Sequence, residues 1–213
     1  MNSSEAKEEI KLFKEELAII KTLTPPTETE IASKRVVLGP KTKKYTLILD
    51  LDQTLVHAGP IAATGIETHI GKEYIISERP YAKELIESLS PKFEIIVFTS
   101  ADEEYANQVY DYFNVGGNIL AKLLTKSSCI ATKEGYLVKD LRIFADRSVN
   151  EILIVDDCII SFAFHLANGI PVTPFDGSAD DNELYHLINY LKKIYESDDI
   201  VKANKEFIGI VNN

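Results

Sequence analysis

Three apolar, β-rich runs stand out along the chain, at residues 45–49, 95–99 and 152–155. Unbroken runs of this length are typical of strands buried on both faces, as in a parallel sheet, because half-buried strands alternate apolar and polar residues. Segments with helical spacing of apolar residues lie between and after these runs, at residues 80–89, 102–113, 180–196 and 198–208. This alternation predicts an α/β fold, a doubly wound parallel sheet with helices on both faces and right-handed crossovers. Residues 65–77 predict a small β-hairpin inserted after the first strand.

The N-terminal region has a different pattern. Apolar residues recur at spacings of three and four between residues 4 and 22, namely Ile10, Phe13, Leu17 and Ile20. This pattern predicts an amphipathic helix that ends at Thr24-Pro25-Pro26. The helix either packs on its own domain or binds a partner, and the sequence does not separate these alternatives.

The expected organisation has four parts. The N-terminal helix occupies 1–24, and a polar linker that becomes basic occupies 25–44. The main domain spans 45–200, and 201–213 contain the end of the last helix and a tail. The basic linker fits either a solvated tether or a docking or import signal.

Composition narrows the functional class. The chain has 213 residues, and 33 acidic against 23 basic residues leave a formal net charge of −10. A chain of this length that is 45% hydrophobic is expected to fold around a core, and its acidity argues against nucleic-acid and anionic-membrane binding. Two cysteines, Cys129 and Cys158, are too few for a disulfide scaffold and lack metal-ligand spacing. With no apolar leader and no bilayer-length run, we expect a soluble intracellular protein, nuclear or cytoplasmic.

Acidic residues follow the first predicted strand at a spacing of two. If the chain stays extended through Leu51, the carboxylates of Asp50 and Asp52 point the same way. Two carboxylates this close repel each other unless one is protonated or a cation lies between them. A hard divalent cation such as Mg²⁺ would resolve the repulsion, whereas the alternative is a capped turn with two solvated acids.

Polar residues also follow the other two strands. The hydroxyls of Thr99 and Ser100 can bind phosphate oxygens or simply cap the next helix. Asp156 and Asp157 can supply further metal ligands or cap a helix. Lys139, inside an apolar stretch, either extends outward or neutralises the acids and stabilises a phosphoryl group. Because ligand sites of α/β sheets lie beyond the carboxyl ends of the strands, the ordered set predicts phosphoryl-transfer chemistry.

Several motifs in this order resemble one known family. They are DLDQTLVH at 50–57, RP at 79–80, FTS at 98–100, YLVKDL at 136–141, IVDD at 154–157, NGIPV at 168–172 and DDNEL at 180–184. From about residue 45 to residue 199 the chain resembles the aspartate-nucleophile (DxDxT) phosphatases of the HAD superfamily, and within it the FCP/SCP-type (NIF-domain) carboxy-terminal-domain phosphatases. The resemblance implies a HAD-like fold and assigns a catalytic role to four residues. By it, Asp50 is the nucleophile, Asp52 the acid and base, Thr99 a phosphate contact, and Lys139 a stabiliser of the aspartyl-phosphate.

The resemblance also implies how metal and phosphate are bound. Mg²⁺ would be held by Asp50, Asp157 and the carbonyl of Asp52, with Thr54 and Asp156 supporting them. The phosphate of the substrate would be contacted by Thr99, Ser100, Lys139 and Lys126. Lys126 falls where the family often has an arginine, so the charge is kept but the bidentate fork is lost.

The chain departs from the family pattern at several positions. Gln53 replaces an acid, Tyr81 stands where glycine is preferred, and Cys158-Ile159 replaces Ser-Pro. The segment between Val56 and Arg79, which shapes peptide selection in the family, is short. These changes leave the catalytic assignment intact but not the identity of the substrate.

The resemblance implies a Mg²⁺-dependent protein serine/threonine phosphatase, with the phosphoserine repeats of RNA polymerase II as a candidate substrate. The expected partner is a phosphoserine or phosphothreonine segment, and the N-terminal helix offers a second partner surface. One alternative is a catalytically silent binding module, like the relative in the import machinery. Another is a small-molecule phosphatase, although such enzymes usually carry a larger cap than this insert provides.

Overall fold

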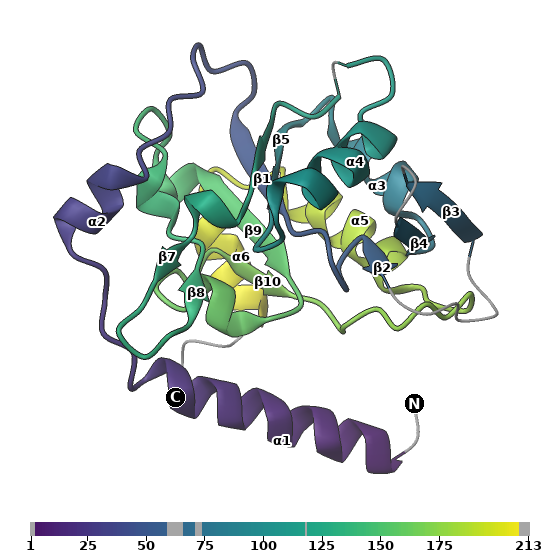
Figure 1. Ribbon diagram of the computed structural model, residues 1–213, viewed down its shortest axis with the longest axis horizontal. Helices are drawn as coiled ribbons and strands as arrows, with labels where there is room; N and C mark the ends of the chain where they lie inside the picture. Colours follow the sequence, from purple (N-terminus) through teal and green to yellow (C-terminus); the bar gives the residue numbers. More distant parts are fainter. Residues whose placement is uncertain (1–2, 59–65, 71–73, 118, 209–213) are drawn as a thin grey trace.

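The centre of the molecule is a five-stranded parallel sheet with strand order β10-β9-β1-β5-β6 (Figure 1). The computed structural model describes the backbone of residues 3–58, 66–70, 74–117 and 119–208. The strands are β1 (Tyr45–Leu49), β5 (Phe93–Phe98), β6 (Lys122–Leu124), β9 (Ile152–Asp156) and β10 (Gly169–Pro171). The predicted α/β fold with a parallel sheet is therefore confirmed. The edge strands β6 and β10 were not anticipated, because each has only three residues and shows no apolar run of its own.

Each face of the sheet is covered by a separate part of the core. Side chains alternate along β1, so Leu47 and Leu49 lie in one buried cluster and Ile48 lies in the other. The first cluster includes residues of α3 (Ala82–Leu89), α4 (Glu103–Phe113) and α5 (Glu183–Ile194), and Ile200 of α6 (Ile200–Ile208) joins it. These helices match the four segments of helical spacing in the sequence.

The opposite face is covered by shorter elements. It carries α2 (Glu28–Ser33), the antiparallel pair β7 (Ile130–Ala131) and β8 (Leu137–Val138), and three 3₁₀ turns. These turns are η2 (Leu141–Ile143), η3 (Val149–Glu151) and η4 (Ile159–Phe162), and a further turn, η1 (Lys126–Ser128), follows β6. Part of the segment expected to be a linker is thus ordered helix, begun by a capping box between Thr27 and Glu30 and docked through buried Ile31. Among the basic residues that follow, Lys34 donates to the carbonyl of Ser127 at 2.6 Å.

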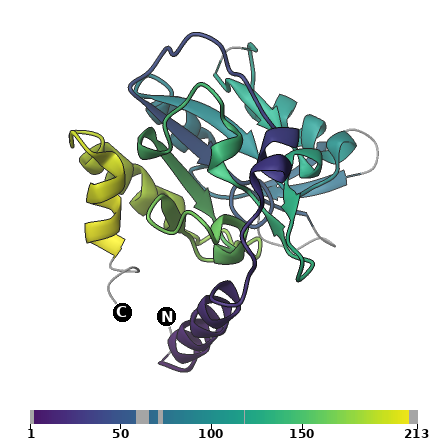
Figure 2. The ribbon, with the colours of Figure 1, turned by 90° about the vertical axis from the view of Figure 1, so that its left-hand side faces the viewer.

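The N-terminal helix α1 (Ser3–Ile20) lies along one edge of the molecule (Figures 1 and 2). Phe13, Leu17 and Ile20 are partly buried against the second core cluster, so the helix packs on its own chain. The side chain of Ile10, expected on the same face, lies outside the described residues. No helix within the described ranges combines the length and apolar character needed to cross a membrane.

A three-stranded antiparallel sheet follows β1. Its strands are β2 (Val56–Ala58), β4 (Tyr74–Glu78) and β3 (Ile66–Ile70), in the order β2-β4-β3. The pairing of β3 with β4 confirms the predicted hairpin insert. Residues 65 and 71–73 of the predicted hairpin lie outside the described residues.

Candidate active site

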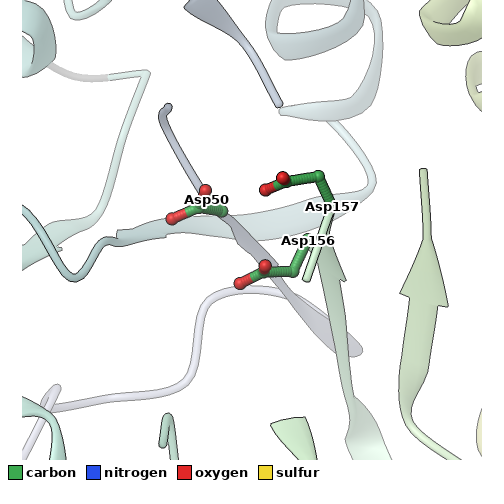
Figure 3. Close-up of side chains that lie close together, drawn as sticks. All are labelled: Asp50, Asp156 and Asp157. Carbon is green, nitrogen blue, oxygen red and sulfur yellow. The ribbon is translucent and has the colours of Figure 1, made fainter. Parts of the chain in front are cut away.

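Three carboxylates converge at the carboxyl ends of β1 and β9. These strands are neighbours, and Leu49 is in register with Val155, which places Asp50 beside Asp156. Oxygens of Asp50, Asp156 and Asp157 all lie within 4.8 Å of one another, and Figure 3 shows the three side chains close together at the strand ends. Asp50 is only 6% exposed and Asp156 only 1%. The fold thus brings together acids that are more than a hundred residues apart in the sequence.

Lys139 joins this cluster from the loop after β8. Its Nζ lies 2.5 Å from Oδ1 of Asp50 and 2.6 Å from Oδ2 of Asp156. The backbone N–H of Lys139 donates to the carbonyl of Ser161, which fixes the loop beneath the side chain. One buried ammonium against three carboxylates leaves the site with excess negative charge, which is costly away from water.

This excess of negative charge, together with burial, shifts the pKa values of the carboxyl groups in the cluster. Burial, opposed by Lys139 and reinforced by Asp156, raises the pKa of Asp50 to about 8. Burial and the charge of Asp156 raise the pKa of Asp157 to about 6. In the opposite sense, Asp156 and Asp50 outweigh burial and raise the pKa of Lys139, so the ammonium stays charged. The site therefore favours either bound protons or an additional cation.

The donor set suits a small divalent cation. All three groups offer carboxylate oxygens, the ligands that Mg²⁺ prefers. The oxygens of one Mg²⁺ site lie at most about 4.2 Å apart, and the three carboxylates here offer oxygens within 4.8 Å of one another. Asp156 is already engaged, since its Oδ1 accepts from the N–H of Cys158 at 2.9 Å and its Oδ2 pairs with Lys139. Asp50 and Asp157 are consequently the acids best able to serve as ligands, with Asp156 supporting them.

The carboxylate of Asp52 has a different environment. It is partly buried and accepts a hydrogen bond of 2.6 Å from the hydroxyl of Tyr105, in the first turns of α4. Burial raises the pKa of Asp52, although the bond from Tyr105 opposes the rise. Helical spacing alone indicates that Tyr105 is a core residue, and its contact with Asp52 appears only when α4 is placed beside the end of β1.

Arg79 fixes the loop that carries Asp52. Its guanidinium is fully buried and donates to both carboxylate oxygens of Asp181 and to the carbonyls of Gln53, Thr54 and Thr173. Those five bonds use all five guanidinium N–H groups. The sequence marked Arg79 only as half of an RP motif, because its partners lie in two distant segments.

The backbone of this loop is strained at one position. Gln53 has φ +59°. This left-handed conformation is energetically unfavourable for any residue that carries a side chain. The neighbouring Thr54 is buried, and its Oγ1 has no hydrogen-bond partner within the described part of the chain. Strain and an unsatisfied hydroxyl beside the acids are features that cluster at functional sites.

The other predicted phosphate contacts lie on and beside the loop after β5. Thr99 is buried, and its Oγ1 accepts from the N–H of Ala101 at 3.0 Å, whereas Ser100 is exposed. Lys126 begins η1, and its Nζ lies 3.5 Å from a carboxylate oxygen of Asp102. The structure places Lys126 next to this loop, with its backbone N–H bonded to the carbonyl of Ala101.

Neither cysteine has the character of a nucleophile. Burial raises the pKa of both Cys129 and Cys158 to about 11, so the thiols stay protonated near neutral pH. Cys158 meets the acidic cluster through its backbone N–H, which donates to Asp156. The chemistry of the site therefore belongs to the acids and Lys139.

Comparison with known proteins matches residues 45–201 to the family model described as NLI interacting factor-like phosphatase. CTD small phosphatase-like protein 3 of Caenorhabditis elegans is 32% identical over 80% of this chain and 62% of its own length. CTD small phosphatase-like protein 2 of Dictyostelium discoideum is 31% identical over 89% of this chain and 33% of its own length. The human carboxy-terminal domain RNA polymerase II polypeptide A small phosphatase 1 is 29% identical over 76% of this chain and 64% of its own.

The chain thus spans less than two thirds of the length of each of these relatives. Among solved structures, that of Fcp1, described as an essential RNA polymerase II CTD phosphatase, aligns with a TM-score of 0.49 and 18% identity. The alignment covers 80% of this chain and 55% of that one.

Proposed function

The chain belongs to the NLI interacting factor-like phosphatase family, and on that basis we propose that it is a Mg²⁺-dependent protein serine/threonine phosphatase. The observation that carries the proposal is the contact of buried Lys139 with both Asp50 and Asp156, beside Asp157 at the strand ends. Such a preorganised positive charge stabilises the negative charge that builds up on a transferring phosphoryl group.

Asp50 is the proposed nucleophile. One of its oxygens attacks the phosphorus of the substrate, the bond to the serine or threonine oxygen breaks, and an aspartyl-phosphate forms on Asp50. Asp52 gives its proton to the leaving oxygen, and its raised pKa supports the protonated form that this step needs. Asp52 then takes a proton from water, whose oxygen attacks the phosphorus and releases inorganic phosphate and free Asp50.

The remaining residues bind and orient the phosphate. Asp50, Asp157 and the main-chain carbonyl of Asp52 would hold Mg²⁺, which when bound neutralises charge on the phosphoryl oxygens. Lys139 keeps the Asp50 carboxylate in place and remains charged throughout. Thr99, Ser100 and Lys126 are the proposed further contacts to the phosphate oxygens, because they lie on or beside the loop that follows β5.

The proposed substrate is a phosphoserine or phosphothreonine segment of a protein. Relatives are named as carboxy-terminal-domain small phosphatases, one of them for RNA polymerase II, so repeat phosphopeptides of that polymerase are the first to test.

The decisive test compares the unmodified protein with Asp50→Asn, using p-nitrophenyl phosphate and a phosphopeptide panel, with Mg²⁺ and with EDTA. We expect Asp50→Asn to lower turnover about a thousandfold or more, and EDTA to abolish the activity of the unmodified protein. Asp111→Asn, an exposed acid on α4 outside the cluster, is the matched control and should retain full activity. Normal turnover by Asp50→Asn would show that Asp50 is not the nucleophile, and activity that survives EDTA would exclude the metal.

A further inference from the structure

A cleft of about 620 Å³ opens between α1 and the end of the sheet that carries the acids. One wall is α1, which contributes Leu12, Phe13, Lys14 and Glu16. The other wall combines Asp157, Cys158 and Ile159 with residues 171–174, which begin at the end of β10. Gln53, next to the catalytic-acid candidate Asp52, lies on its border, so the cleft is continuous with the proposed active site.

The C-terminal part of α1 is packed against the rest of the molecule. Leu17, Ile19 and Ile20 are packed against the core clusters that contain Ile159 and Ile160 of η4, the turn that directly follows Asp157 and Cys158. Beyond the helix, the hydroxyl of Thr24 donates to Glu134 at 2.7 Å, which ties the chain to the β7–β8 connection. Figure 2 shows the rest of α1 extending past the body of the molecule from this attachment.

The lining of the cleft is mainly apolar. Its apolar lining residues are Leu12, Phe13, Ile159, Pro171, Val172 and Pro174. Leu12 remains 55% exposed although it borders this recess, so its side chain gains burial only when something enters. The volume is within the range of ligand pockets and accommodates two or more amino-acid side chains.

We propose that this cleft binds apolar side chains of the substrate polypeptide, at positions flanking the phosphorylated serine or threonine. The inference rests on the proposed function. Asp157 contributes both to the acidic cluster and to the wall of the cleft, so a segment whose phosphate reaches Asp50 has its flanking residues next to this recess. The residues attached to the phosphoresidue are therefore the occupant best placed to fill it, and α1 becomes a determinant of specificity.

The test uses the full chain and phosphoserine peptides in a glycine–serine background, with a single Leu or Ala moved through each flanking position. We expect at least one position at which Leu gives a kcat/KM about tenfold higher than Ala, since a side chain of this size gains that much from burial. In Leu12→Gln the preference should fall to about threefold or less, while turnover of p-nitrophenyl phosphate stays unchanged. Val115→Gln, at an apolar residue that is 71% exposed and does not line the cleft, is the matched control.

Leu12→Ala is the second variant, because loss of apolar surface without a new polar group should give an intermediate preference. The inference is overturned if no position favours Leu, or if Leu12→Gln keeps the full preference. It is also overturned if Leu12→Gln raises the turnover of every peptide alike, since α1 would then be a cover over the site. In each of these cases hydrolysis of p-nitrophenyl phosphate with Mg²⁺ leaves the proposed function standing. Absence of that hydrolysis in the unmodified protein would remove both.

Discussion

The contact of Arg79 with Asp181 offers the sharpest test of how this site is held together. The Arg79 side chain is 0% exposed and that of Asp181 is 16% exposed, with Nη2 of Arg79 2.9 Å from Oδ2 of Asp181. Asp181→Ala removes the only carboxylate that Arg79 contacts within the described residues and leaves a buried charge with three carbonyl partners.

The expected loss follows from this geometry. Removing one partner of a buried pair typically costs about 3–5 kcal/mol, and the surviving carbonyl contacts place this case near about 3 kcal/mol. For a chain of this size that corresponds to a fall in melting temperature of about 6–12 °C. Because Arg79 also holds the carbonyls of Gln53 and Thr54, turnover of p-nitrophenyl phosphate should fall even at temperatures where the variant is folded.

Urea unfolding gives the free energy, and kcat at 15 °C gives the effect on the site. Glu196→Ala is the control, because it removes a surface ion pair with Lys92 whose glutamate side chain is 74% exposed. That change should stay within about 0.5 kcal/mol. If Asp181→Ala were no more destabilising than Glu196→Ala, the argument that Arg79 anchors the loop would be refuted.

Three further predictions concern single residues. Tyr81 has φ +68°, a left-handed conformation that strains alanine but not glycine. The free energy of unfolding in urea should therefore be about 1 kcal/mol higher for Tyr81→Gly than for Tyr81→Ala, and equal values would contradict this. Tyr105→Phe removes the bond to Asp52 and should lower kcat for p-nitrophenyl phosphate about tenfold with little change in melting temperature, whereas unchanged kcat would separate Tyr105 from the chemistry. Burial alone would raise the pKa of Asp140, but hydrogen bonds from His165 and neighbouring donors outweigh it and hold that pKa well below its usual range. The stability gained is fully present at neutral pH and is lost progressively only once pH falls below about 4, so in urea unfolding Asp140→Asn should be most destabilising at pH 7 and progressively less destabilising from pH 4 downward.

Much of the fold can be predicted from local patterns in the sequence. The runs at 45–49 and 152–155 are apolar enough to require burial on both faces, and the helices between them show regular spacing. The short strands β6 and β10 escaped detection because three residues carry no periodicity, and they become strands only by pairing with β5 and β9.

The sequence by itself also determined which residues were candidates for the chemistry, since the acids and Thr99 follow strands that end at one edge of a parallel sheet, and Lys139 stands inside an apolar stretch. Only the tertiary structure decided how these groups are arranged. The carboxylates that lie close to one another are those of Asp50, Asp156 and Asp157, whereas the carboxylate of Asp52 accepts a hydrogen bond from Tyr105. The sequence likewise did not reveal that Arg79 forms hydrogen bonds with two distant segments, or that α1 lies beside the acids. The physical reason is that spacing along a chain reports local geometry and burial, whereas contacts between distant segments depend on strand order and on packing.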